Sequence, residues 1–140
     1  NDTHGHDVGD LVLKHAAVAF KSCLREADTV SRTGGDEFQI ILHEYKTLDD
    51  IHVVAKKILN VINAPFTISY EGKDIDCNIG SSIGISLFPD HGEDISDVTR
   101  NADLSMYYVK KVMGKNNYKI YGEDVIASNC GGDMRKAERG

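Results

Sequence analysis

The sequence predicts an α+β fold, in which helices pack against a sheet that contains antiparallel strands. Apolar residues recur with helical spacing in three segments, and five shorter segments have the composition of strands. Turn-forming residues lie between neighbouring strands. The resulting order of helix, hairpin, helix, hairpin, helix and strand approaches the split βαβ arrangement, but it lacks an opening strand.

The first helix and the first hairpin occupy the start of the chain. Apolar residues lie along one face of a helix between Val8 and Leu24. Two strands follow, over residues 28–32 and 38–43, and the glycine pair between them is typical of a tight hairpin turn. The second strand is mostly apolar, so we expect it to be buried.

The second helix has the clearest pattern in the sequence. Thr47 is placed to cap it, and two aspartates follow in the first turn, where they favour the helix dipole. Apolar residues then recur at i, i+3, i+4, i+7, i+8 and i+11 from Ile51 to Ile62, and Pro65 follows the end of the helix.

The rest of the chain carries the second hairpin and the third helix. We expect strands over residues 66–70 and 74–88, and the internal Gly80 and Gly84 indicate a bend or a close backbone approach. Ser96 is placed to cap the third helix, and Gly114 to end it. A last strand covers residues 117–121, so we expect one domain over residues 1–126 and a tail or linker over residues 127–140.

Composition bounds the function. The 140 residues carry 41% hydrophobic and 27% charged side chains, as in one globular domain, and no apolar run approaches the length of a membrane helix. The net charge of −6 argues against a nucleic-acid polymer as partner. Three widely spaced cysteines, Cys23, Cys77 and Cys130, indicate neither a zinc site nor a disulfide framework, so we expect a reducing, cytoplasmic setting.

The segment with the clearest chemical content is residues 32–38, RTGGDEF. Gly34 and Gly35 lack Cβ atoms, which lets a ligand approach the backbone. Asp36 and Glu37 follow at the start of a strand, and carboxylates suit Mg²⁺ bound together with substrate phosphates. The alternative is a plain Gly-Gly hairpin with two solvated acids.

Four motifs together resemble the GGDEF family. They are GGDEF at residues 34–38, the string ND-x-x-GH-x-x-GD at residues 1–10, SIGIS at residues 82–86 followed by Pro89, and NAD-x-x-MY at residues 101–107. They occur in the order of the family, and the resemblance covers roughly residues 1–122. It implies a palm-like, nucleotide-cyclase βαββαβ sheet with helices, whose first strand is absent from the sequence.

The resemblance implies a diguanylate cyclase domain. Two such domains meet face to face as a transient or regulated homodimer, and each supplies one GTP. Attack of a 3′-hydroxyl on an α-phosphate gives cyclic di-GMP and pyrophosphate, with two Mg²⁺ (or Mn²⁺) ions stabilising charge. An upstream sensory domain is expected. The alternatives are a GGDEF-type module that binds GTP or cyclic di-GMP without turnover, and another palm-like nucleotidyl transferase.

The resemblance also implies roles for residues of the motifs. Asp36 stands at the position of a metal-ligating acid that helps deprotonate the 3′-hydroxyl, and Glu37 is the second acid. Gly34 and Gly35 make room for the nucleotide. Asn1 and Asp10 stand at positions that hydrogen-bond guanine, as an amide and a carboxylate can. The alternative for Asp10 is an acid in the first turn of a helix.

A lysine region near the end of the third helix departs from the family pattern. Lys110 is similar to a phosphate-contacting lysine, but the sequence has one residue more before Gly114 than the family has. Either Lys110 or Lys111 takes the phosphate role, and Lys115 replaces the usual arginine. The alternative is a solvated basic helix end.

Arg25 and Asp28 resemble the product-inhibition site of the family, where such a pair holds a cyclic di-GMP dimer. Arginine is suited to bidentate contact with phosphate or guanine. The alternative is a surface pair in which the two charges neutralise each other. No role is assigned to four histidines, His15, His43, His52 and His91.

Family members begin with a strand that carries a further metal-ligating acid and a Phe-Lys pair. This segment would lie before Asn1, and we expect it to exist upstream of the sequence. A polypeptide that truly began at Asn1 is expected to have no cyclase activity, because half of the metal site would be missing.

Overall fold

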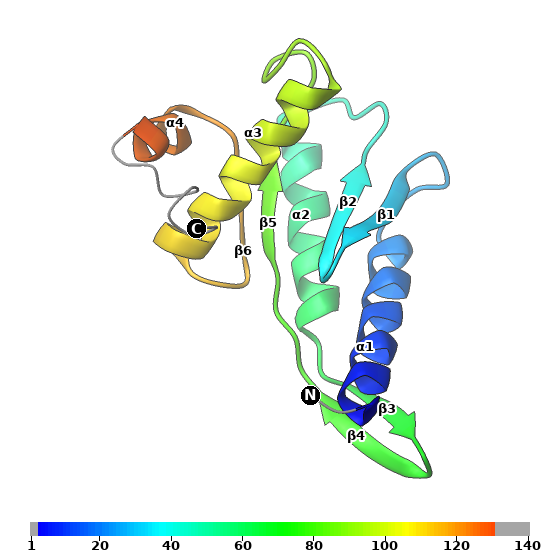
Figure 1. Cartoon of the computed structure of the whole chain (residues 1–140). Helices are drawn as coiled ribbons and strands as arrows, with labels where there is room; N and C mark the ends of the chain where they lie inside the picture. Colours follow the sequence, from blue (N-terminus) through cyan, green and yellow to red (C-terminus); the bar gives the residue numbers. More distant parts are fainter. Residues whose placement is uncertain (1–2, 131–140) are drawn as a thin grey trace. The chain divides into compact units, whose positions relative to one another are not determined.

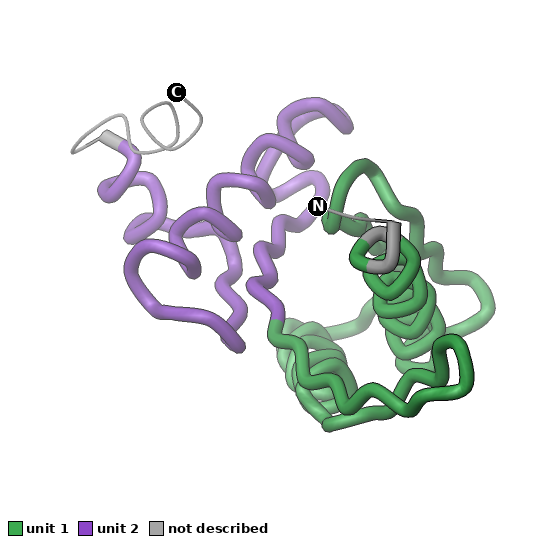
Figure 2. Tube along the Cα trace, turned by 60° about the horizontal axis from the view of Figure 1, so that its bottom comes forward, with its two compact units in different colours: residues 1–80 green, residues 81–140 purple. Residues whose placement is uncertain are grey.

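The computed structural model describes residues 3–130, with the backbone alone for Thr3, His4, His6 and Cys130. The chain forms two compact units, residues 1–80 and residues 81–140 (Figure 2). The elements of the first unit are α1 (Thr3–Ser22), β1 (Thr29–Gly34), β2 (Glu37–Ile41), α2 (Leu48–Asn63), β3 (Phe66–Tyr70) and β4 (Lys73–Cys77) (Figure 1). Those of the second are β5 (Ser82–Ile85), α3 (Ile95–Tyr108), the π-helical turn η1 (Val109–Met113), β6 (Asn117–Ile120) and α4 (Glu123–Cys130).

The strands of residues 3–130 pair as three two-stranded ladders. β1 pairs with β2 and β3 with β4, both antiparallel, which confirms the two predicted hairpins and the mixed α+β class. The burial predicted for the second strand is wrong, because successive side chains of a strand point to opposite faces, and in β2 exposed residues alternate with half-buried ones. The strand predicted over residues 74–88 is divided into β4 and β5. β4 pairs back on β3, whereas β5 pairs in parallel with β6 after the crossover through α3, so one continuous strand could not serve both partners.

The core of the first unit lies between its helices and its hairpins. The apolar face predicted for the second helix is confirmed, since four of its positions are buried in α2. His15 of α1 stacks on Phe66 of β3 with ring centroids 3.6 Å apart, and Phe20 of α1 meets Phe38 of β2 edge to face at 5.1 Å. The buried apolar residues are Ala16, Ala19, Phe20, Cys23, Ile51, Ala55, Ile58, Ile62 and Ile68.

The start of α2 confirms the cap predicted at Thr47. The Thr47 hydroxyl accepts from the Asp50 N–H over 3.2 Å, and the Asp50 carboxylate accepts from the Thr47 N–H over 3.1 Å. This reciprocal capping box satisfies N–H groups that have no partner within the helix. The capping box therefore fixes the residue at which α2 begins.

In the second unit, β5 packs directly against α3. A Cβ atom on Gly84 would stand 2.0 Å from the Ala102 carbonyl oxygen and 2.2 Å from the Met106 nitrogen, so this glycine is required by the close backbone approach that the sequence indicated. The cap of α3 was predicted at Ser96, and this was wrong. Asp94 is the cap, because its Oδ1 accepts from the Asp97 N–H over 2.9 Å.

Two further element boundaries differ from the prediction. Helix α1 begins at Thr3 rather than Val8. Helix α4 covers residues 123–130 and therefore crosses the boundary predicted between residues 126 and 127, because Val125 is buried and ties this segment to the second unit. Residues 131–140 of the predicted tail lie outside the described residues, and the extent of the domain stays a prediction.

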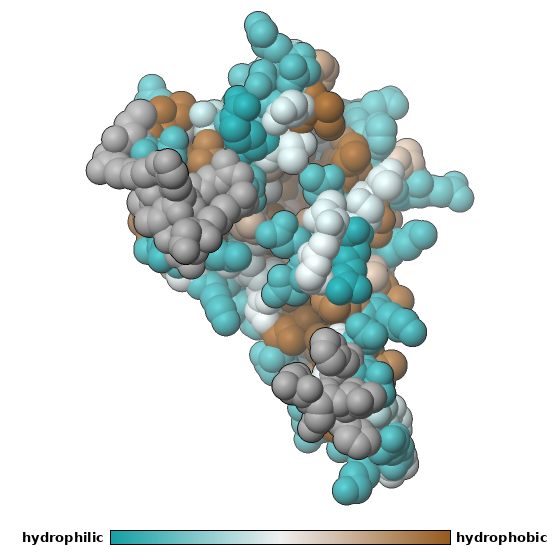
Figure 3. All heavy atoms as spheres, viewed as in Figure 1, coloured by the Kyte–Doolittle hydropathy of each residue, from teal (hydrophilic) through white to brown (hydrophobic). Residues whose placement is uncertain are grey.

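The surface is mainly hydrophilic in the view of Figure 3, where apolar side chains form separate patches. Val18 on α1 and Val53 on α2 are among the exposed apolar residues, at 70% and 62%. Scattered residues of this kind are normal for folded proteins. None of the helices in the described part of the chain is long and apolar enough to cross a membrane.

Candidate functional site

The GGDEF turn joins β1 to β2. β1 ends at Gly34 and β2 begins at Glu37, and the pairing between the strands is irregular between Arg32 and Gly34. Gly35 has φ 49°, in the left-handed region that favours glycine. A Cβ atom on Gly34 or Gly35 would meet nothing within 4 Å. The turn therefore has an open side on which a ligand could approach the backbone.

Two side chains of β1 donate hydrogen bonds to the backbone of this turn. The Nε of Arg32 donates to the Gly35 carbonyl oxygen over 2.7 Å, and the Thr33 hydroxyl donates to the Glu37 carbonyl oxygen over 3.4 Å. Sequence reasoning gave neither residue a role. The only available signal was their position within the motif, directly before the two glycines.

Asp36 and Glu37 are adjacent and exposed at this turn. In the described residues, no group of three or more His, Cys, Asp and Glu side chains is placed to hold a metal ion. The turn by itself thus offers two carboxylates. That donor set fits Mg²⁺ or Mn²⁺ carried by a nucleotide, because Mg²⁺ commonly takes one or two carboxylates and fills its remaining positions with phosphates and water.

The two residues predicted to bind guanine are at the start of the chain. Asn1 lies outside the described residues. Asp10 is exposed on α1. Because α1 begins at Thr3, Asp10 lies beyond the first turn, so the alternative of a first-turn acid is wrong.

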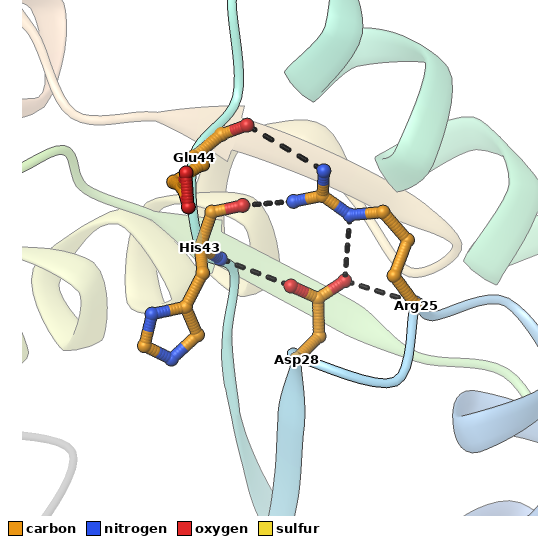
Figure 4. A network of polar contacts seen from close by, with 4 residues as sticks. All are labelled: Arg25, Asp28, His43 and Glu44. Atoms are coloured by element: carbon orange, nitrogen blue, oxygen red, sulfur yellow. Dashed lines mark hydrogen bonds and ion pairs between the residues drawn. The ribbon is translucent and has the colours of Figure 1, made fainter.

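The predicted pair Arg25 and Asp28 is in contact, in a network that Figure 4 shows. Asp28 Oδ2 accepts from the Arg25 N–H over 3.0 Å and from Arg25 Nε over 3.4 Å. Asp28 Oδ1 accepts from the His43 N–H over 2.9 Å. The two terminal nitrogens of Arg25 donate to the carbonyl oxygens of His43 and Glu44. The pair therefore links the loop before β1 to the chain after β2.

The same network sets the ionisation of Asp28. Burial of the carboxyl acts to raise its pKa. The hydrogen bonds from the His43 N–H and from the Arg25 backbone and side chain, together with the Arg25 charge, outweigh this effect and hold the pKa of Asp28 below its ordinary value. Asp28 is therefore a carboxylate at neutral pH, matched to the guanidinium beside it.

The lysines of the candidate phosphate contact belong to the second unit. α3 continues into the π-helical turn η1, where the Gly114 N–H donates to the Val109 carbonyl oxygen over 2.8 Å, five residues back. This wider turn holds one residue more than an α-helical turn, which accounts for the extra residue before Gly114. Gly114 ends the segment with φ 87°, as predicted.

The structure distinguishes the two adjacent lysines. Both are exposed, but Lys111 Nζ lies 5.8 Å from the centre of the Tyr107 ring, a cation–π distance. Lys115 lies between Gly114 and Asn116, both of which have positive φ angles. Asn116 and Ser81 exchange two hydrogen bonds, of 2.8 and 3.2 Å, so the backbone that carries Lys115 is joined to the start of β5.

His91, which was given no role, organises the loop between β5 and α3. Its Nδ1 accepts from the Leu87 N–H over 2.9 Å, and its carbonyl oxygen accepts from the Asn101 amide over 2.7 Å. Asn101 begins the fourth motif, so this motif contributes to the packing of the loop. Sequence reasoning missed this because the contact of Asn101 with His91 joins residues ten positions apart.

The candidate residues are divided between the units. One turn of the first unit carries Gly34, Gly35, Asp36 and Glu37. The first unit also contains Asp10, Arg25 and Asp28, and the second unit contains Lys110 and Lys115.

Comparisons with known proteins agree with the motifs. The family described as "Diguanylate cyclase, GGDEF domain" matches residues 1–117. MucR, a bifunctional diguanylate cyclase/cyclic di-GMP phosphodiesterase of Pseudomonas aeruginosa, is 35% identical over 128 residues, which cover 91% of this chain and 18% of MucR. NbdA of the same organism, a cyclic di-GMP phosphodiesterase, is 30% identical over 126 residues, which cover 90% of this chain and 15% of NbdA.

A crystal structure of an EAL/GGDEF domain protein from M. capsulatus has the same fold, with a TM-score of 0.74 and 40% identity. The match covers 88% of this chain and 76% of that chain. The chain spans less than a fifth of the length of MucR and of NbdA. With the family matched over most of its residues and the fold shared with a solved relative, the chain belongs to the GGDEF family of diguanylate cyclase domains.

Proposed function

We propose that this chain is the catalytic domain of a diguanylate cyclase, which condenses two GTP molecules into cyclic di-GMP and pyrophosphate where two such domains meet. The observation that carries the proposal is the turn at residues 34–37. It combines an open backbone at Gly34 and Gly35 with two exposed carboxylates at Asp36 and Glu37. This combination suits a nucleoside triphosphate bound with a divalent cation.

Within this proposal Asp36 ligates the cation and assists deprotonation of the 3′-hydroxyl, and Glu37 supports cation or nucleotide placement. A bound Mg²⁺ or Mn²⁺ would supply charge neutralisation for the phosphates. Asp10 accepts hydrogen bonds from guanine, and Asn1 is proposed as its amide partner. The open side of Gly34 and Gly35 leaves room for the nucleotide.

Lys110 and Lys115 are proposed to contact phosphates. Lys110 and Lys111 are both exposed, and Lys110 is preferred because the Nζ of Lys111 already lies over the Tyr107 ring. Lys115 is on a backbone segment held between Gly114 and the pairing of Asn116 with Ser81. The ammonium group of a lysine acts as a point charge, which suits binding to a phosphate group.

Arg25 and Asp28 are proposed as the product-inhibition site. The Arg25 side chain is 60% exposed, so an anion in solvent can reach it, whereas the Asp28 side chain is 3% exposed. Product binding would therefore begin at the guanidinium. It requires the guanidinium to exchange the carbonyl oxygens of His43 and Glu44 for phosphate or guanine acceptors.

A second candidate is a GGDEF-type module that binds GTP or cyclic di-GMP without turnover. The observation in its favour is the match to NbdA, a protein named for phosphodiesterase activity and not for cyclase activity. In such a protein the domain would regulate a neighbour through ligand binding. A transient homodimer and an upstream sensory domain belong to the first proposal.

The test measures binding and turnover separately. Calorimetry follows the binding of a non-hydrolysable GTP analogue with and without Mg²⁺, and chromatography follows cyclic di-GMP formation from GTP, in this chain and in a version extended upstream to include the expected first strand. The cyclase proposal expects Mg²⁺-dependent binding, with turnover in the extended version. Asp36→Ala should lower turnover at least about 100-fold, the scale for losing one group that stabilises developing charge.

Asp49→Ala is the matched control, because Asp49 is an exposed aspartate in α2 outside the turn. Binding without turnover in either version would favour the second candidate. Absence of nucleotide binding in both versions would contradict both candidates. An Asp36→Ala variant with activity within a few-fold of wild type would refute the role of Asp36.

A further inference from the structure

The side chain of Arg32 folds back on the GGDEF turn. Its Nε donates to the Gly35 carbonyl oxygen over 2.7 Å, and this carbonyl belongs to the peptide group that joins Gly35 to Asp36. The regular pairing of β1 with β2 is interrupted between Arg32 and Gly34. The hydrogen bond therefore spans the irregular step between the Arg32–Phe38 pair and the Gly34–Glu37 pair.

The backbone pair of Gly34 with Glu37 closes the turn, and side chains restrain it further. Glycine has wide conformational freedom, so the φ of 49° at Gly35 must be selected by contacts rather than by the residue itself. The β2 side is anchored at Phe38, which meets Phe20 of the core edge to face. Phe38 is also the cross-strand partner of Arg32. Of the two β1 side chains that donate to the turn, Arg32 makes the shorter hydrogen bond, since the Thr33 contact measures 3.4 Å.

Arg32 holds the turn without neutralising its acids. Ion pairs of the described residues include Arg25 with Asp28, Arg100 with Asp97 and Lys119 with Asp124. In this part of the chain Asp36 and Glu37 form no ion pair, and both are exposed. The carboxylates thus stay available to a cation.

We propose that Arg32 is a positioning residue for the cation and nucleotide site of this turn. Its bond to the Gly35 carbonyl oxygen holds the Gly35–Asp36 peptide group in one orientation, and this sets the direction in which Asp36 presents its carboxylate. Rigid support of this kind determines whether a binding group is productive. The inference rests on the proposed function of Asp36, and it adds a residue that acts through the backbone.

The test uses Arg32→Ala and Arg32→Lys in the full chain. Calorimetry gives the Mg²⁺ concentration for half-maximal binding of a non-hydrolysable GTP analogue, and NMR gives the hydrogen-exchange rates of the amides at residues 35–37. Arg32→Ala should raise that Mg²⁺ concentration roughly three- to tenfold, the scale of one hydrogen bond, and should speed exchange in the turn. The melting temperature should not change, because Arg32 is exposed.

Arg32→Lys should resemble Arg32→Ala, because an ammonium on a flexible chain does not reproduce the fixed Nε–H of arginine. Arg100→Ala is the control, since Arg100 is an exposed arginine of α3 paired with Asp97. Wild-type Mg²⁺ dependence in Arg32→Lys would show that charge alone matters and would overturn the proposal. Unchanged exchange rates in Arg32→Ala would overturn it as well.

The proposed function can fail separately. If wild type and Asp36→Ala both lack Mg²⁺-dependent binding in this chain and in the version extended upstream, the function is wrong, and the inference that depends on it falls too. If Asp36→Ala abolishes binding while Arg32→Ala leaves both the Mg²⁺ dependence and the exchange rates unchanged, the positioning role alone is refuted.

Discussion

Arg25 Nε and Asp28 Oδ2 lie 3.4 Å apart, and this pair closes a network that joins the loop before β1 to the chain after β2. The two side chains differ in access, since that of Arg25 is 60% exposed and that of Asp28 is 3% exposed. Asp28 satisfies backbone N–H groups, whereas Arg25 donates to backbone carbonyl oxygens. Asp28 thus has a structural role, and Arg25 is the residue of the pair that anions in solvent can reach.

Arg25→Ala is expected to weaken cyclic di-GMP binding by roughly 10- to 100-fold, because charge-assisted hydrogen bonds to phosphate or guanine would be lost. Calorimetry with cyclic di-GMP measures this effect. Lys21→Ala, which removes an exposed cation at the end of α1, is the matched control and should bind normally. Unchanged affinity in Arg25→Ala would rule out product binding at this pair.

Asp28→Asn is expected to destabilise the fold by about 1–2 kcal/mol at pH 7, because the amide would place a donor against the Arg25 N–H groups. The pKa of Asp28 is lowered in the folded state, so its contribution is present above the ordinary carboxyl value of about 4 and is lost as the pH falls through the lower folded value. Urea unfolding of both proteins between pH 7 and pH 3 should show the difference shrinking at the acid end. If the difference in the free energy of unfolding between wild type and Asp28→Asn did not depend on pH, the ionised Asp28 carboxylate would not be the stabilising group.

Tyr70 is expected to ionise well above the ordinary pKa of a tyrosine. Its hydroxyl donates to Asp7 Oδ2 over 2.9 Å, which links β3 to α1, and this hydrogen bond, with smaller effects of burial and of the Asp7 and Glu71 charges, raises the pKa of Tyr70 to about 12. The contribution of the protonated Tyr70 hydroxyl to the stability of the fold is complete at pH values below the ordinary tyrosine pKa of about 10. It is lost as the pH rises through the pKa of Tyr70 in the folded state.

Ultraviolet titration of the phenolate tests this expectation. The difference between wild type and Tyr70→Phe isolates one of the six tyrosines, and its midpoint should lie near 12. Asp7→Asn should move that midpoint down, because the carboxylate acceptor and its charge are removed. A midpoint near 10 in wild type would show that the contact between Tyr70 and Asp7 does not form.

Gly84→Ala is expected to cost about 3 kcal/mol or more, because the added Cβ would collide with the backbone of α3 at Ala102 and Met106. Gly9→Ala is the matched control. Gly9 lies within α1, and a Cβ there would meet nothing within 4 Å, so alanine should stabilise this helix by about 0.5–1 kcal/mol. Denaturant unfolding measures both variants, and equal effects would contradict the close packing of β5 on α3.

The elements that depend on neighbouring residues could be predicted from the sequence. The α2 face from Ile51 to Ile62, its cap at Thr47, the glycine turn at residues 34–35 and the end of the third helix at Gly114 are all local patterns, and each was confirmed. The cap of α3 was misplaced because Ser96 and Asp94 are both good capping residues. Only the backbone geometry selects between them.

The sequence by itself determined the family, because four motifs in register require only the order of residues, and it determined the local helices and turns, whose energies depend on neighbours along the chain. The tertiary structure alone decided the parallel pairing of β5 with β6, the support of the GGDEF turn by Arg32, and the contact of Arg25 with His43 and Glu44. These contacts depend on which groups, distant in sequence, the packing brings within hydrogen-bond distance. Before folding, many other groups could be the partners of the same donors and acceptors, and only the folded backbone selects among them.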